Sequence, residues 1–211
     1  MKVLAKTLGS KWFMIPLLAS VGLYFLVLTP FSGQVADPAE KILHNSGEVA
    51  IWMLGAVLAL TPLRVLFPRS AIIGALNRHR RAIGVSSGLY GLIHFSFHLL
   101  TQGLLQGDWE SVRHSFGNLF VWYGLGGLTI LLVLTLTSNG LAMRLLGGRK
   151  WKQLHRLVYL AAALLIYHQA IAGKGHWYIA KYLFFPLAAL ELARLAKTYL
   201  FAGSIRQPPV L

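Results

Sequence analysis

The amino-acid sequence predicts an all-α membrane protein, a six-transmembrane helix bundle with both termini cytoplasmic. Three observations predict this fold. Hydrophobic residues make up 56% of the 211 residues and charged residues only 12%, whereas a soluble domain carries about 25% charged residues. The apolar residues gather in long runs that are almost free of charge. The basic residues fall mainly into every second interval between these runs.

Six apolar runs are long enough to cross a bilayer, whose hydrocarbon core of about 30 Å requires roughly 20 helical residues. The expected spans are residues 12–30, 48–67, 83–101, 118–137, 154–172 and 177–196. The first run resembles a signal peptide, but it is long for that role and no small-x-small cleavage site follows, so we expect a retained span. Because the loops are short, we expect residues 1–211 to form one transmembrane domain.

The basic residues predict the orientation. If the N-terminus is cytoplasmic, only four of the 20 Lys and Arg residues face outward: Lys41, Arg113, Lys174 and Lys181. Cytoplasmic loops are enriched in Lys and Arg, so this distribution favours an even number of spans with both ends inside. It also accounts for the net charge of +14, and we expect lipid, and no nucleic acid, around this chain.

The residue types exclude several chemistries. Cysteine is absent, which rules out disulfides, thiolate zinc sites and iron–sulfur clusters. The spans contain no convincing nucleophile–base pair and no metalloprotease, serine-hydrolase or phosphate-loop motif, so no catalytic residue is expected. Redox or metal chemistry would therefore depend on histidine, a carboxylate or a bound cofactor.

Several histidines lie inside the expected spans, where ionisable side chains are costly and usually functional. His94 lies roughly 16 Å into the third span and His168 roughly 21 Å into the fifth, at a rise of about 1.5 Å per residue. Both spans are expected to enter the membrane from the cytoplasm. The two histidines therefore lie at a similar depth, in the outer half of the bilayer. Two neutral imidazoles on facing helices can ligate an iron from both sides. The histidines in loops or at span ends are His44, His79, His114 and His176.

Small residues precede His94 on one helix face. Gly84, Ser87, Gly88 and Gly91 recur at spacings of three and four, which places them in one stripe with the histidine. The stripe leaves room for a flat porphyrin, although tight helix packing through small residues is also common in membranes. The glycine-rich segment 124–127 lies within a span and is expected to serve packing.

Two further histidines have open roles. His98, one turn beyond His94, could be a rival ligand, a partner for a propionate or an interfacial residue. His155 opens the fifth span at its cytoplasmic edge, roughly 140° around the helix from His168. It could hold a second cofactor or be structural. The third span offers no matching histidine, because Arg80 and Arg81 stand at the corresponding positions.

Two long sequence elements resemble the ferric-reductase-like transmembrane superfamily. The first is Arg78-His79-Arg80-Arg81-Ala82-Ile83-Gly84, followed by His94, and the second is Trp151-Lys152-Gln153-Leu154-His155-Arg156-Leu157-Val158-Tyr159, followed by His168. Asp37-Pro38 with His44 in the first outer loop, Thr61-Pro62-Leu63 and Leu136-Thr137-Ser138 also fit. The resemblance covers nearly the whole chain and is closest to the haem-binding membrane subunits of bacterial methionine sulfoxide reductase systems.

The resemblance implies an electron-transfer subunit of the bacterial inner membrane rather than the subunit that reduces methionine sulfoxide. Such proteins bind haem b and have been associated with FMN. They pass electrons from quinol or a cytoplasmic flavin reductase to a periplasmic molybdopterin reductase. The family's haem histidines correspond to His94, His155 and His168 here, while the absence of a fourth histidine puts a second bis-histidine haem in doubt.

Our leading hypothesis is therefore a transmembrane electron carrier with a haem b between His94 and His168. One alternative is a quinol-oxidising b-type cytochrome that serves another periplasmic enzyme. Another is a transporter whose histidines ligate a metal ion. The basic segments 78–81 and 144–152 could receive a flavin phosphate or an acidic donor, or could reflect orientation alone.

Overall fold

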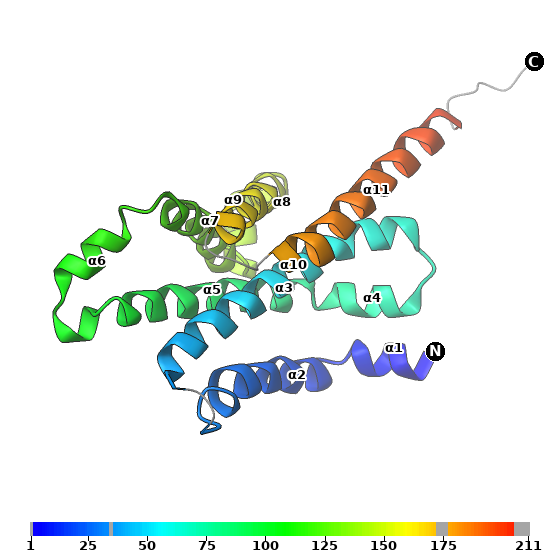
Figure 1. Cartoon of the computed structure of the whole chain (residues 1–211). Helices are drawn as coiled ribbons and strands as arrows, with labels where there is room; N and C mark the ends of the chain where they lie inside the picture. The colour runs from blue at the N-terminus through cyan, green and yellow to red at the C-terminus, as the bar shows by residue number, and fades with distance from the viewer. Residues whose placement is uncertain (1, 34–35, 172–176, 205–211) are drawn as a thin grey trace, which may run out of the picture.

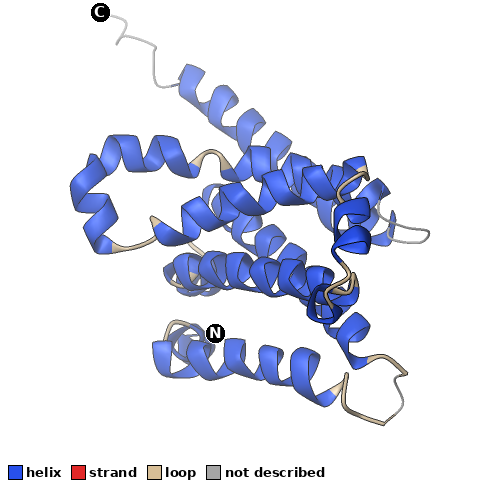
Figure 2. Ribbon diagram, turned by 90° about the vertical axis from the view of Figure 1, so that its left-hand side faces the viewer, coloured by secondary structure: helices blue, strands red, loops and turns tan. Residues whose placement is uncertain are grey.

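The computed structural model describes residues 2–33, 36–171 and 177–204, and all regular elements within these ranges are helices (Figure 2). Lys174 and His176, expected in an outer loop, lie outside the described residues. The helices, in chain order, are α1 (Lys2–Leu8), α2 (Lys11–Leu23), the π-helix η1 (Tyr24–Leu28), α3 (Pro38–Leu66), α4 (Ala71–Arg78), α5 (Arg80–Thr101), the 3-10 helix η2 (Leu104–Gln106), α6 (Trp109–Ser115), α7 (Leu119–Leu136), α8 (Gly140–His155), α9 (Val158–Ile171), α10 (Trp177–Ile179), the π-helix η3 (Ala180–Phe184) and α11 (Phe185–Ser204).

Five of the described helical segments are long and apolar enough to cross a membrane: Lys11–Leu28, Pro38–Leu66, Arg80–Thr101, Leu119–Leu136 and Gly140–Ile171. They contain or closely match the first five expected spans. The sixth expected span falls on α10, η3 and α11, a stretch that is not among these five. The all-helical membrane fold is thus confirmed, while the number of spans and the orientation of the termini stay predictions.

The start of α3 differs from the expectation. The helix begins at Pro38, well before residue 48, because Asp37 caps it: its carboxylate accepts from the N–H groups of Ala39 at 2.8 Å and Glu40 at 3.2 Å. Proline is well suited to the first helical position, where its missing N–H would be unsatisfied anyway. His44 consequently lies on α3 and not in a loop.

The helices pack as two antiparallel pairs. The most extensive contacts join α3 to α5 and α7 to α9; α5 packs against α7, and α11 packs along α3. Leu54 of α3, Leu131 of α7 and Ala161 of α9 belong to the central apolar cluster. The Ser87 hydroxyl donates to the carbonyl of Ala50 at 2.8 Å in a buried bond that ties α5 to α3.

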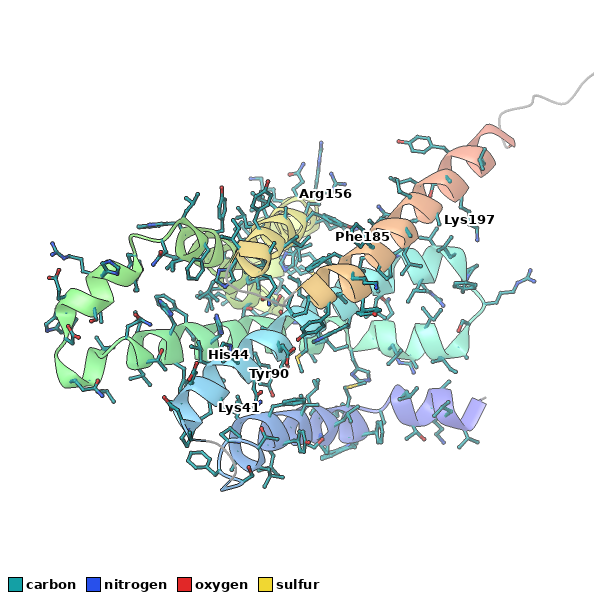
Figure 3. All side chains as sticks on the ribbon, viewed as in Figure 1. Lys41, His44, Tyr90, Arg156, Phe185 and Lys197 are labelled. Carbon is teal, nitrogen blue, oxygen red and sulfur yellow. The ribbon has the colours of Figure 1, made fainter. Side chains whose placement is uncertain are left out.

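The bundle has two distinct ends. Figure 1 shows α6 and the start of α3 at one end, and α1, α4 and the C-terminal part of α11 toward the other. Figure 3 shows Lys41 and His44 on the first turns of α3 and Lys197 at the opposite end. Lys197 donates to the carbonyls of Val65 and Leu66, both at 3.0 Å, and so binds the last turn of α3 to α11. A cation there also complements the negative end of the helix dipole.

Candidate functional site

Two cavities lie between the helix pairs. One, which we name the outer cavity after the expected orientation, lies at the α6 end, has a volume of about 430 Å³ and is lined by residues of α3, α5, α7 and α9. The other, named the inner cavity for the same reason, lies toward the α4 end and has a volume of about 420 Å³. Leu131 lines both of them, so an apolar layer of the core lies between two chambers. Volumes of about 300–1,000 Å³ are typical of cofactor and ligand sites.

His94 of α5 and His168 of α9 face each other across the outer cavity. Their ring centroids lie 6.1 Å apart and their planes are inclined at 83°. The Nδ1 atom of His94 lies 2.9 Å from the carbonyl of Leu43, and Nδ1 of His168 lies 2.8 Å from the carbonyl of Phe120. A carbonyl can only accept a hydrogen bond, so both imidazoles carry their proton on Nδ1 and keep the Nε2 lone pair for another ligand.

The separation of the two rings fits one metal ion between them. Two metal–nitrogen bonds of about 2.0 Å, with roughly 1.1 Å from each nitrogen to its ring centre, place the centroids about 6.2 Å apart. Among the described residues, no three His, Cys, Asp or Glu side chains cluster closely enough to hold a metal ion. Two imidazoles therefore suit a metal that brings its remaining ligands with it, as the iron of haem does.

The outer cavity has a polar mouth. His98, one turn above His94, lines it, and the Nε2 atom of His98 is buried without a hydrogen-bond partner. Lys41 and His44 stand at the exposed start of α3. Glu48 is half-buried in the same wall, with no bonding partner among the described residues. The mouth thus offers hydrogen-bond donors and one acid beside the histidine pair.

The glycine stripe of α5 divides into three environments. Gly91 lines the outer cavity and Gly84 the inner one. Gly88 lies between them, where a Cβ atom would meet the Thr135 hydroxyl and come within 3.5 Å of the Leu131 carbonyl. The stripe therefore has features of both interpretations of the sequence, space for a cofactor and tight helix packing. Its ends border cavities, and its centre packs α5 against α7.

His155 lies apart from the other two expected ligands, in the wall of the inner cavity. Its ring stacks on Trp151 with centroids 3.8 Å apart. Its Nδ1 lies 3.1 Å from the Trp151 carbonyl and its Nε2 lies 3.3 Å from the Ser138 hydroxyl. The described lining of this cavity contains five cations and no carboxylate: Arg78, Arg80, Arg81, Lys152 and Arg156. The inner cavity is therefore suited to an anionic group.

Sequence reasoning missed two glycines of the outer cavity. Gly47 of α3 lies against the His94 ring, and Gly124 of α7 lies against the His168 ring. In the glycine-rich segment 124–127, Gly126 and Gly127 pack against Leu164 and Leu165 of α9, as expected for packing, whereas Gly124 does not. The residue type alone does not predict that a glycine lies against a histidine ring, because this contact depends on which helix packs alongside.

The fold and the site define a class of protein, a membrane helix bundle with a pair of opposed histidines inside it. A family model described as ferric reductase like transmembrane component matches residues 46–166, more than half of the chain. The match includes His94 and ends two residues before His168. No solved structure matches the chain.

Curated relatives narrow the class. The chain is 36% identical to the protein-methionine-sulfoxide reductase heme-binding subunit MsrQ of Deinococcus radiodurans, over 81% of this chain and 82% of the relative. It is 35% identical to the MsrQ of Agrobacterium fabrum, over 73% and 68%, and 36% identical to that of Brucella ovis, over 80% and 74%. The chain therefore belongs to the ferric-reductase-like transmembrane family and, within it, to the MsrQ proteins.

Proposed function

We propose that this chain is the haem b-binding electron-transfer subunit of a bacterial methionine sulfoxide reductase system. One observation carries the proposal: two imidazoles with free Nε2 atoms face each other across a cavity, with ring centroids 6.1 Å apart. Bound haem would supply a one-electron iron couple, and the protein would tune its potential through axial ligands, hydrogen bonds and burial. The names of the relatives support the same cofactor.

His94 and His168 would hold the haem iron. Their Nδ1–H groups are held by the carbonyls of Leu43 and Phe120, and such bonds orient a ligating imidazole and raise its basicity. Gly91 leaves space beside His94 in the cavity wall. The polar mouth would accommodate the carboxylates of the cofactor, with His98 as one donor.

The positions of the two cavities support a direction of transfer. The outer cavity opens beside the first turns of α3, at the end with few cations, and the inner cavity lies among the arginines near α4. By the positive-inside rule, the inner cavity would lie on the cytoplasmic side of a bacterial inner membrane. The chain would then accept electrons from a quinol or a cytoplasmic flavin reductase and deliver them to a periplasmic molybdopterin reductase, MsrP.

The inner cavity would hold a second group. His155 and the surrounding cations favour an anionic cofactor such as FMN, or a second haem with a single histidine ligand. Because Nδ1 of His155 is bonded to the Trp151 carbonyl, a haem iron would have to replace the Ser138 hydroxyl at Nε2. FMN would leave that bond in place. A haem and flavin count on the purified protein decides between one cofactor and two.

The haem assignment is tested on the purified chain. Dithionite reduction should produce the Soret and α bands of a b-type haem, and His94→Ala and His168→Ala should each remove most of the haem. His114→Ala is the matched control, because this residue lies on α6 outside both cavities. Absence of the bands, or unchanged haem content in both ligand variants, would refute the proposal.

The acceptor is tested separately. The pre-reduced chain should be reoxidised by purified MsrP only when methionine sulfoxide is present. Reoxidation that needs a different periplasmic enzyme would favour the alternative quinol-oxidising cytochrome. A metal transporter predicts metal uptake by vesicles with no bound porphyrin.

A further inference from the structure

The two histidines are held by the same arrangement on two different helices. On α3, the carbonyl of Leu43 binds Nδ1 of His94, and Gly47 lies against the Nδ1 side of the same ring. On α7, the carbonyl of Phe120 binds Nδ1 of His168, and the backbone of Gly124 lies against that ring. In both cases the glycine follows the carbonyl residue by one helical turn, so the two groups share one helix face.

The contacts leave no space for a side chain at either glycine. A Cβ atom at Gly47 would lie 2.7 Å from Nδ1 and 3.0 Å from Cε1 of His94. At Gly124 it would lie 2.7 Å from Nδ1 and 2.9 Å from Cε1 of His168. Real Cβ atoms essentially never lie closer than 3.0 Å to another heavy atom. An imidazole that moved away from the new Cβ would lengthen or break its Nδ1 hydrogen bond to the carbonyl. A side chain at either position must therefore turn or displace the imidazole.

We propose that Leu43 with Gly47, and Phe120 with Gly124, form two equivalent cradles that fix the rotation of the two imidazoles and hold their planes near perpendicular. The observed interplanar angle is 83°. Each cradle belongs to the partner helix within its pair: α3 holds the histidine of α5, and α7 holds that of α9. Gly47 and Gly124 are thus positioning residues, and this inference rests on the proposed haem function.

The ring orientation has a spectroscopic consequence. Each axial imidazole donates π-electron density into the iron d orbital perpendicular to its plane. Near-parallel planes split the two d orbitals and give a rhombic low-spin ferric EPR spectrum, whereas near-perpendicular planes leave them almost degenerate and give one highly anisotropic signal. The cradles therefore predict the anisotropic signal for the unmodified chain when it is loaded with haem.

Three alanine variants test the cradles: Gly47→Ala, Gly124→Ala and, as the matched control, Gly126→Ala. Gly126 lies on α7 close to Gly124, but its Cβ would meet only Leu164 Cδ1 at 3.4 Å, an ordinary contact. We expect Gly47→Ala and Gly124→Ala to shift the EPR spectrum toward the rhombic form or to lower haem retention several-fold. Gly126→Ala should keep both the spectrum and the haem content.

The outcomes separate this inference from the haem assignment. A haem-loaded parent chain with a rhombic spectrum overturns the cradles even if no variant folds, and so do parent-like spectra and haem contents in both cradle variants. A parent chain without any b-type haem overturns the proposed function, and the cradles with it. A highly anisotropic parent signal that changes in the two cradle variants but not in the control supports the inference.

Discussion

Replacing Gly88 by alanine tests whether the centre of the α5 glycine stripe packs helices or borders a cofactor. The new Cβ would meet the Thr135 hydroxyl and lie 3.3 Å from Thr135 Cβ. Threonine side chains in helices have few alternative rotamers, so overpacking here costs about 1–3 kcal/mol. The gain in helix propensity from glycine to alanine offsets about 1 kcal/mol. We therefore expect a net loss of about 1 kcal/mol in the free energy of unfolding.

A double-mutant cycle with Thr135→Ala isolates the contact. Without the hydroxyl, Gly88→Ala should stabilise the protein by up to about 1 kcal/mol, so the sign of its effect reverses between the two backgrounds. The coupling energy should amount to about 1–3 kcal/mol. Equilibrium unfolding of the detergent-solubilised protein with added SDS measures the four free energies. An equal effect of Gly88→Ala in both backgrounds, together with loss of haem, would show that Gly88 borders the cofactor.

Three further substitutions address the remaining helix contacts. Asn45→Leu removes the bonds from the Asn45 amide to the Phe25 carbonyl at 2.7 Å and the Thr29 hydroxyl at 2.9 Å; it should cost about 1 kcal/mol in SDS unfolding and expose the α2–η1 segment to protease first, whereas uniform protection would contradict this. Lys197→Met removes the cap on α3 and should cost about 1 kcal/mol; an unchanged unfolding curve would show that the cap contributes nothing. The hydrogen bonds from Ser111 lower the pKa of Asp108 below its usual 3.8, so the cap on α6 stabilises above that pH and is lost as the pH falls through the lowered value; hydrogen exchange of the α6 amides should follow this dependence in the parent chain and not in Asp108→Asn.

The sequence predicted the extents of two central helices well. α5 and α7 begin and end within a few residues of the expected third and fourth spans, since bilayer thickness sets the length of an apolar run. The helix α3 begins well before the expected second span, because its start depends on the Asp37 cap and not on hydropathy. Asp37-Pro38 is a readable signal for a helix start, so this boundary was available from the sequence.

The histidine pair was also within reach of the sequence. Depth along a helix follows from the rise per residue, and two histidines at similar depth on helices that enter from the same side can meet. The structure brings His94 and His168 together and leaves His155 in the other cavity. Whether α5 and α9 face each other across a cavity was not readable, because this depends on the register in which α3–α5 and α7–α9 pack.

The cradles show why such a role escapes a reading of one chain. Gly47 lies more than a whole helix away from His94 in sequence, and nothing in its residue type separates it from Gly126, which meets only the end of a leucine side chain. Small residues serve close packing throughout membrane helices, so the distinguishing feature is the neighbour and not the glycine. The carbonyl one turn earlier gives no sequence signal for this role either, since every residue has a backbone carbonyl. Only the pairing of helices converts a carbonyl and a glycine at that spacing into a device that orients an imidazole, and the same conversion occurs independently on α3 and α7.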